Sequence, residues 1–408
     1  MRYIACFFLL LAGAAACTKH NAPPESSFQL TVTVDAALGS VSRLGATDTF
    51  VVRLNNPQAC ILLPVELHIP KGARSSLGNQ MDDSTWSASV TLSWNKVVSV
   101  TVTAANGNSG TYAIVYDYVF STQPLMTGGV QAFPRGVFFA GDTLYIPTSA
   151  GLYVSADSGG HFSILLPSNG LGDSIVNGVY VRGGVIYAAT VGGLSVSTDG
   201  GQHFTNHLLG GNPVYSVYVQ GDTVYAGTDG GVYISRDGGM NYTTSVVGMG
   251  NRETLAVYAR GSTVYAGTAN GLAISPNGGV SFTNYTNNGL GSLGGQYQCN
   301  GLAVQGSNVY VATIGGFSVS ADGGVSFTNY YSAAGLGANW TNGVDVQDGV
   351  IWVGTNGGLS YSLDGGAHFA TITADIGLGT ELVYGSVLRG TTIYSATGAG
   401  LSVIRSRL

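Results

Sequence analysis

The chain has 408 residues, a formal net charge of −6 and only 9% charged residues, while glycine occupies 63 positions. This length exceeds the roughly 100–200 residues of one typical domain and predicts two folded units. No run of lysine or arginine is present that could neutralise phosphates, which argues against nucleic acid as a partner. Valine, threonine, tyrosine, isoleucine and phenylalanine fill the stretches between glycines, so we expect an all-β protein with short strands and tight turns.

The first 17 residues have the pattern of an export signal. A positive charge near the start is followed by an apolar stretch, Ile4–Ala12, and then by small residues that lead to Cys17. The apolar stretch is shorter than the about 20 residues of a membrane span. The approach to Cys17 resembles the lipobox of bacterial lipoproteins, although Ala14 stands where leucine is usual. The resemblance implies lipidation of Cys17 as the only membrane attachment; secretion with cleavage near Ala16 is the alternative.

A β-sandwich is predicted after a short tether. Residues 18–27 (TKHNAPPESS) are polar and contain proline, which predicts disorder. Residues 28–120 alternate apolar and polar positions in runs such as FQLTVTV and TYAIVYDYVF, as half-buried strands do. The hairpin at 100–116, with Val102-Thr103-Ala104, the turn Asn106-Gly107, Tyr112 and Ile114, resembles the closing segment of immunoglobulin-like modules in Bacteroides-type surface lipoproteins. Residues 121–127 (STQPLMT) are the predicted linker.

One strand motif recurs seven times in residues 128–408. The copies are LYIPT (144–148), IYAAT (186–190), VYAGT (224–228), VYAGT (264–268), VYVAT (309–313), IWVGT (351–355) and IYSAT (393–397). A period of about 40 residues with four short strands predicts a seven-bladed β-propeller, because stacking in a ring buries both faces of every sheet. The last repeat ends after its third strand, Leu401–Ile404. We therefore expect Gly129–Phe133 to supply its fourth strand.

An eight-residue turn follows the third strand in six repeats. The copies are SADSGGHF (155–162), STDGGQHF (197–204), SRDGGMNY (235–242), SPNGGVSF (275–282), SADGGVSF (320–327) and SLDGGAHF (362–369). Their third-position side chains can accept turn N–H groups, which gives a structural role to Asp157, Asp199, Asp237, Asn277, Asp322 and Asp364. A catalytic or calcium-binding role is disfavoured because such a group is needed once per site, not once per repeat.

These octets match the Asp-box pattern, and the chain from about Met126 to Leu408 resembles BNR or WD40/YVTN/BNR-like propellers. That superfamily includes sialidases, xyloglucan-degrading glycoside hydrolases, sortilin-type receptors and photosystem II assembly-factor-like proteins. The resemblance implies fold more than function. A sialidase would have six blades and an early Arg-Ile-Pro motif, whereas this chain has seven repeats and FPRG at 133–136. Arg182, Arg260 and Arg389 lie near turns and are interpreted as solvated charges.

The resemblance places ligand binding on the face formed by the loops that connect one repeat to the next and by the turns between the second and third strands. Carboxylates expected there are Asp173, Asp229, Glu253, Asp375 and Glu381, and further candidates for ligand contact are Arg252, Gln296, Tyr297, Asn339 and Trp340. Aromatic and amide side chains suit a sugar or peptide surface, although they can equally pack the loops down. The recurrent Gly-Leu-Gly of these loops is expected to turn its leucine inward.

The sequence predicts a monomeric cell-envelope lipoprotein, in the outer membrane, whose propeller binds a glycan or protein without catalysis. The alternative is a glycoside hydrolase that uses two carboxylates of the loop face. Cys60 and Cys299 fit neither a metal site nor a disulfide framework, so we expect two buried thiols. No metal or other cofactor is expected.

Overall fold

The computed structural model describes residues 6–11, 31–33, 39–43, 50–54, 60–69, 73–76, 78–81, 85–93, 98–103, 109–116, 118–286, 289–291, 297–347, 349–390 and 392–406. It confirms an all-β protein and divides into two compact units: Met1–Val119 with Arg405–Leu408, and Phe120–Ile404. Among the described residues, the only helices are short 3₁₀ turns, so none has the length and apolar character needed to cross a membrane.

In the first unit, the described residues form two sheets, with the strand orders β3-β4-β1-β10-β9-β6 and β2-β5-β8-β7. The strands are β1 (Cys6–Leu11), β2 (Thr31–Thr33), β3 (Gly39–Arg43), β4 (Phe50–Leu54), β5 (Cys60–His68), β6 (Arg74–Ser75), β7 (Asn79–Gln80), β8 (Thr85–Ser93), β9 (Val98–Thr103) and β10 (Ser109–Tyr116). The antiparallel pair β9–β10 coincides with the predicted hairpin at 100–116. Strand β1 comes from the predicted export signal, whose removal stays a prediction. Cys17, the tether at 18–27 and the side chain of Cys60 lie outside the described part.

In the second unit, the described residues form seven four-stranded sheets and one small hairpin. The sheets are β14 (Phe138–Ala140), β15 (Thr143–Thr148), β16 (Gly151–Ser155) and β17 (Ser163–Leu165); β18 (Val176–Arg182), β19 (Val185–Thr190), β20 (Gly193–Ser197) and β21 (Thr205–His207); β22 (Val214–Gln220), β23 (Thr223–Thr228), β24 (Gly231–Ser235) and β25 (Thr243–Ser245); β26 (Thr254–Arg260), β27 (Thr263–Thr268), β28 (Gly271–Ser275) and β29 (Thr283–Tyr285); β30 (Cys299–Gln305), β31 (Asn308–Thr313), β32 (Gly316–Ser320) and β33 (Thr328–Tyr330); β34 (Thr341–Gln347), β35 (Val350–Thr355), β36 (Gly358–Ser362) and β37 (Ala370–Ile372); and β11 (Tyr118–Gln123), β38 (Val383–Arg389), β39 (Thr392–Thr397) and β40 (Gly400–Ser406). The hairpin consists of β12 (Met126–Thr127) and β13 (Val130–Gln131), and the 3₁₀ turns are η1 (Pro167–Asn169), η2 (Leu209–Gly211), η4 (Ser332–Ala334) and η5 (Ala374–Ile376).

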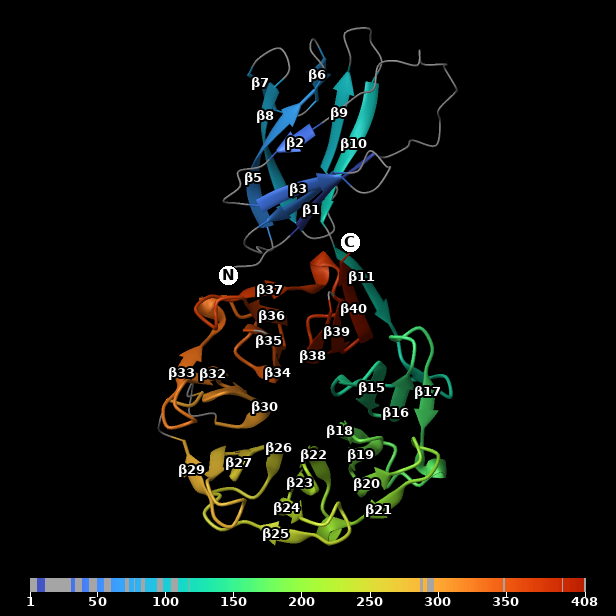
Figure 1. The fold of residues 1–408 in the computed structure, drawn as a ribbon, viewed down its shortest axis with the longest axis vertical. Coiled ribbons are helices and arrows are strands. Elements are labelled where there is room, and N and C mark those ends of the chain that lie inside the picture. Colours follow the sequence, from blue (N-terminus) through green and yellow to red (C-terminus); the bar gives the residue numbers. More distant parts are fainter. Residues whose placement is uncertain are drawn as a thin grey trace. The chain divides into compact units, whose positions relative to one another are not determined.

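These sheets stand side by side around a common centre, which the first strands of the sheets, such as β18, β22 and β26, approach most closely (Figure 1). Each of the seven repeated strand motifs forms the second strand of a sheet, and five of the six residues in every such strand are buried. The buried residues come from both faces of the sheets, so the repeats are held together by the contacts between neighbours.

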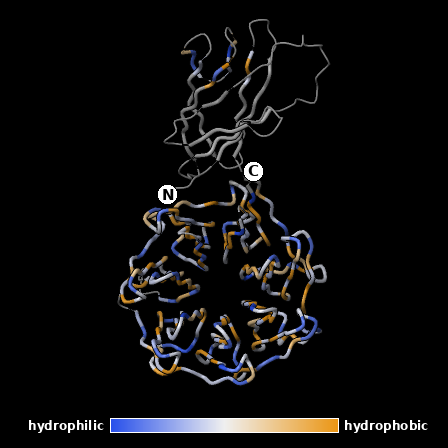
Figure 2. The backbone as a smooth tube through the Cα atoms, in the orientation of Figure 1, coloured by the Kyte–Doolittle hydropathy of each residue, from blue (hydrophilic) through white to orange (hydrophobic). Residues whose placement is uncertain are grey.

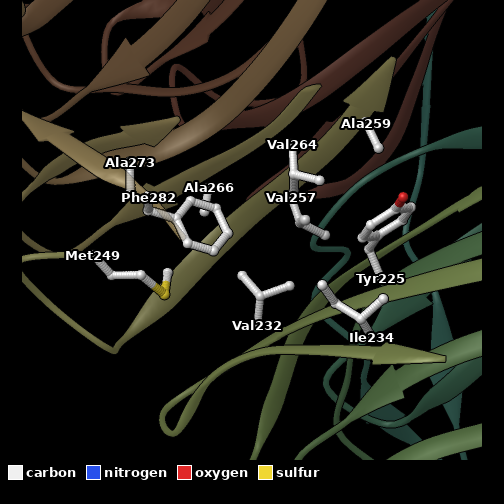
Figure 3. Packing of buried hydrophobic residues seen from close by; sticks show 10 residues of the cluster. All are labelled: Tyr225, Val232, Ile234, Met249, Val257, Ala259, Val264, Ala266, Ala273 and Phe282. Carbon is white, nitrogen blue, oxygen red and sulfur yellow. The ribbon is translucent and has the colours of Figure 1, made fainter. Parts of the chain in front are cut away.

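Apolar side chains fill the spaces between adjacent sheets. In one such cluster, Tyr225, Val232 and Ile234 of one sheet pack against Val257 and Val264 of the next (Figure 3). Burying a valine or isoleucine side chain contributes about 1.5–3 kcal/mol, and the cluster repeats between the other sheets. Hydrophobic segments, drawn in orange, occur in the sheets all around the second unit (Figure 2).

The last sheet takes its outer strand from the N-terminal side of the repeats, but not from the predicted segment. Gly129–Phe133 was expected to pair there; instead, its residues Val130–Gln131 form β13, which pairs only with β12. The neighbour of β40 is β11, which is joined to it by a hydrogen bond between the hydroxyls of Thr122 and Ser402 (2.8 Å). Gly128 and Gly129 have positive φ and form a turn, which is why this segment does not extend into a longer strand. Strand β11 also includes the first residues of the predicted linker at 121–127.

Side chains connect the last sheet to the first. The Phe139 ring lies 4.9 Å from the Tyr394 ring, and the Arg389 guanidinium lies over Phe139 at 5.3 Å from its centroid. The same guanidinium donates a hydrogen bond to Asp142. The last sheet of the second unit is therefore in direct contact with the first.

Candidate functional site

The loops between sheets and the turns between second and third strands meet at one end of the second unit. The N–H groups of Val191, Ala269 and Asn356, all in such turns, donate to the carbonyls of Ile175, Glu253 and Trp340, which end the preceding loops. We call this end the loop end. The octet turns contact the turns between first and second strands at the opposite end, as in the bond from Gly238 N–H to the Asp222 carbonyl (2.9 Å).

The Gly-Leu-Gly bends fix the loops as expected. Their leucines are at most 4% exposed, which confirms the inward orientation: Leu171, Leu290, Leu336 and Leu378. Gly170 has a φ of +91°, and a Cβ there would lie 2.4 Å from the carbonyl oxygen of Phe204, so glycine is required. The hydroxyl of Ser195 accepts the N–H of Gly172 at 2.9 Å and donates to Asn206 Oδ1 at 3.0 Å. The loops are therefore tied to the third and fourth strands of a sheet.

The predicted ligand-contact residues occupy similar places at the loop end. Most belong to the last residues of a loop before the next first strand: Asp173, Arg252, Glu253, Tyr297, Asn339, Trp340 and Glu381. Asp375 lies earlier in its loop, in η5, and Gln296 lies outside the described residues. These residues are distributed over five loops, so the structure brings them to one end without gathering them into one cluster.

Two of these side chains are engaged within their own loops. Asp173 Oδ1 accepts the N–H of Ile175 at 2.8 Å, and Asn339 Oδ1 accepts the N–H of Ser332 at 2.8 Å. Trp340 is different, because 48% of its surface is exposed. Asp173 and Asn339 thus shape the loops, and Trp340 offers an aromatic surface.

Sequence reasoning missed a ring of residues in the first strands. In six sheets the pairing of first and second strands shifts by one residue near the loop end, and one residue bulges out: Asn177, Tyr215, Leu255, Asn300, Asn342 and Tyr384. Three of them link neighbouring sheets, because Asn177, Asn300 and Asn342 donate from Nδ2 to carbonyls of the next first strand at 2.8–2.9 Å. The sequence signal for these three bulges was an Asn-Gly pair, which occurs at 177–178, 300–301 and 342–343.

Tyr215 is the centre of the best-defined polar group at this end. Its hydroxyl donates to Asp229 Oδ1 at 2.9 Å. Burial raises the pKa of Tyr215 to about 12, helped by the hydrogen bond to Asp229 and by the negative charges of Asp229 and Glu253. The phenol therefore stays protonated at neutral pH; Asp229 is its hydrogen-bond partner, and Glu253 of the next repeat acts on it through its charge. The sequence had indicated both carboxylates but not the tyrosine.

Two further pairs of amide side chains are hydrogen-bonded near the loop end. Gln298 Nε2 donates to Asn300 Oδ1 at 2.9 Å, and Asn342 Nδ2 donates to Asn356 Oδ1 at 3.0 Å. Fixed amides and carboxylates beside aromatic rings suit a ligand rich in hydroxyl groups. Among the described residues, no three metal-ligating side chains come together. The thiol of Cys299 is buried, as predicted.

The octet turns show a different use of carboxylates. Asp157 Oδ1 accepts the hydroxyl of Ser155 at 2.7 Å and the N–H of His161 at 2.8 Å, and Ser155 Oγ accepts Gly159 N–H at 2.8 Å. The same three bonds recur in the other five octets. Hydrogen bonds lower the pKa of Asp237 to about 2, and the largest effect comes from the backbone N–H of Asn241. The octet side chains therefore serve as hydrogen-bond acceptors for the backbone N–H groups of their own turns.

The arginines of the first strands lie at the end away from Tyr215. Arg182, Arg260 and Arg389 end their strands next to the turns between first and second strands. Arg260 donates to the carbonyl of Gly306 in the next repeat, and Arg389 pairs with Asp142. Arg260 and Arg389 therefore join sheets, and none of the three arginines is placed to share a ligand with the tyrosine.

No protein-family model matches the chain, and no curated protein matches it significantly. Solved structures do resemble it. An extracellular domain from B. thetaiotaomicron has a TM-score of 0.59 and 15% identity over 70% of this chain, which spans 39% of that one. An ancestral GH74 enzyme has a TM-score of 0.53 and 17% identity over 69% of this chain and 46% of its own. The computationally designed Ika8 protein has a TM-score of 0.50 and 11% identity, with 78% and 92% covered. At these identities the likeness concerns the fold, which is propeller-like.

Proposed function

We propose that this protein is an exported lipoprotein whose seven-bladed β-propeller binds a glycan at the loop end without catalysis. The observation that carries the proposal is the Tyr215 group: a protonated phenol that donates to Asp229 and is influenced by the charge of Glu253 in the next repeat. A sugar presents adjacent hydroxyls and an apolar ring face, and such a ligand matches carboxylate acceptors next to an aromatic ring. The exposed ring of Trp340 would add a second stacking surface at the same end.

The proposed binding mode can be tested on the purified protein with glycan arrays and calorimetry. Tyr215→Phe removes the hydroxyl and Asp229→Asn removes the charge, so each should weaken glycan binding at least tenfold. Asp222→Asn is the matched control, because Asp222 lies in a turn at the opposite end. The proposal fails if no glycan binds, or if the two loop-end variants bind as the wild type does. If a protein partner is captured instead, and its capture depends on Tyr215, the ligand of the loop end is a protein and not a glycan.

A glycoside hydrolase is the second candidate. It is favoured by two carboxylates of adjacent repeats whose charges both act on one tyrosine, and by the fold likeness to a GH74 enzyme, which itself carries no activity over to this chain. Hydrolysis would need one carboxylate as acid and the other as base or nucleophile. Release of reducing ends that is lost in both Asp229→Asn and Glu253→Gln would establish it, and binding without turnover would exclude it for the glycan tested.

The attachment to the cell envelope is proposed on the sequence. Lipidation of Cys17 would hold the protein at a membrane, the outer membrane being favoured, and residues 18–27 with an immunoglobulin-like module would separate the propeller from it. Cys17→Ala should release the protein from the membrane fraction and remove the acyl mass. A variant that stays in the membrane with an unchanged mass would contradict the lipid anchor.

A further inference from the structure

Seven equivalent positions lie in the first strands of the seven sheets. They are equivalent because each pairs with the same aromatic position of the second strand: Phe138 with Tyr145, Tyr180 with Tyr187, Tyr218 with Tyr225, Tyr258 with Tyr265, Ala303 with Tyr310, Asp345 with Trp352 and Val387 with Tyr394. The first strand is the edge of its sheet that faces the centre of the ring (Figure 1). We call these seven residues the inner belt.

Four consecutive members of the inner belt are aromatic and contact one another. The ring centroids of Phe138 and Tyr180 are 5.2 Å apart, those of Tyr180 and Tyr218 are 5.1 Å apart, and those of Tyr218 and Tyr258 are 4.5 Å apart. All four side chains are only half-buried. Burial raises the pKa of Tyr218, and its hydroxyl lies close to that of Tyr258. More than half of the belt is therefore a continuous aromatic arc with part of its surface exposed.

The rest of the inner belt contains a carboxylate that forms no ion pair with the described residues. Asp345 is half-buried, and its neighbours in the belt are the small side chains of Ala303 and Val387. Burial raises the pKa of Asp345, although the backbone N–H groups of Val346 and Leu388 oppose the shift. Among the described residues, the one arginine in an ion pair with a carboxylate is Arg389, and its partner is Asp142. The chain from residue 97 onwards has no lysine.

Aromatic faces and a half-buried carboxylate share one preference, because both attract an ammonium group that has left bulk water. A neutral sugar would leave the carboxylate unneutralised, and an anion would be repelled by it. We propose that the inner belt binds a compact organic cation, through its aromatic arc and Asp345. The ligand class is a primary or quaternary ammonium group, either free or on a side chain of a larger partner. This site is separate from the Tyr215 group and does not depend on the proposed glycan binding.

The test uses the full mature protein with butylammonium and tetramethylammonium chlorides as probes, at constant ionic strength, by calorimetry. Butanol serves as the neutral analogue and sodium chloride as the inorganic control. We expect saturable binding of the ammonium probes alone. Asp345→Asn should weaken it at least tenfold, and it keeps an oxygen that can accept the two backbone N–H groups, so the fold is retained.

A second variant separates the arc from the charge. Tyr218→Leu removes the ring in the middle of the arc and should also weaken ammonium binding at least tenfold, whereas Asp222→Asn, in an exposed turn, should leave it unchanged. Thermal unfolding of each variant reports folding independently. Absence of saturable binding, equal binding of butanol, or an Asp345→Asn variant that is folded and binds as the wild type does would each overturn the proposal.

Discussion

Single residues decide how well each loop is tied to its sheet. In four third strands a serine at the third position accepts the N–H of the loop glycine, as Ser195 accepts that of Gly172. In the sheet of β26–β29 this position is Ala273. Its neighbour on the fourth strand, Asn284, consequently has a buried Oδ1 with no hydrogen-bond partner in the described structure. A buried acceptor without a partner costs about 1–3 kcal/mol.

Restoring the serine should therefore stabilise the protein. Ala273→Ser should donate to Asn284 Oδ1 and increase the free energy of unfolding by about 0.5–1.5 kcal/mol, the usual net value of one hydrogen bond. Urea denaturation measures the change. Ala273→Val adds volume without a donor and is the matched control, which should be destabilised. If the serine variant is no more stable than the wild type, the assignment of Asn284 as an unpaired acceptor is wrong.

From the lowered pKa of an octet carboxylate we predict that the free energy of unfolding depends on pH. The folded-state pKa of Asp237 is about 2, below its ordinary value near 4. A depressed pKa means that the folded state favours the ionised form, so this stabilisation is complete above the ordinary pKa and is lost as the pH falls towards 2. Asp237→Asn should be less dependent on pH between 4 and 2, when denaturation midpoints are compared. An identical pH profile in both proteins would contradict the role given to this carboxylate; Asn277 already occupies the position in one repeat.

At the scale of elements, closure of the last sheet depends on β11. Without β11, the edge of β40 would be exposed, and unpaired strand edges promote aggregation. A chain that begins at Tyr118 should unfold cooperatively, whereas a chain that begins at Pro124 should show a lower melting temperature or aggregate. Scanning calorimetry and size-exclusion chromatography distinguish these results. Equal behaviour of both chains would show that the segment after Pro124 can close the sheet.

The elements also show what the sequence could predict. The second strands and the octets were found because they recur with their key residues in the same order, and recurrence is visible without a structure. The closing strand was misassigned because β11 and Gly129–Phe133 are both short apolar stretches, and only the two-glycine turn at 128–129 separates them. Tyr215 was missed because a bulge changes which face a residue occupies, and a bulge has no fixed sequence pattern. Asp229 and Glu253 were found, since carboxylates in predicted loops are evident from their type.

The second unit as a whole carries an excess of negative charge. Residues 120–404 contain six arginines and no lysine against fourteen carboxylates, a net charge of −8. Such a surface disfavours polyanions and is consistent with a neutral or cationic ligand. Two of the six arginines, Arg260 and Arg389, form hydrogen bonds that join one sheet to the next.

Arg389 is the residue through which the closure of the entire ring can be measured. Its guanidinium lies over Phe139 of the first sheet and also pairs with Asp142, whose side chain is 96% exposed. An exposed ion pair contributes little, whereas a cation–π contact contributes about 0.5–1 kcal/mol at an exposed site. Arg389→Ala should therefore lower the free energy of unfolding by about 0.5–1 kcal/mol in urea titrations, and Asp142→Ala should change it by less than about 0.3 kcal/mol. Arg389→Lys, which keeps the charge but loses the planar group, should fall between them. Equal losses in Arg389→Ala and Asp142→Ala would instead identify the ion pair, and not the ring contact, as the interaction that joins the last sheet to the first.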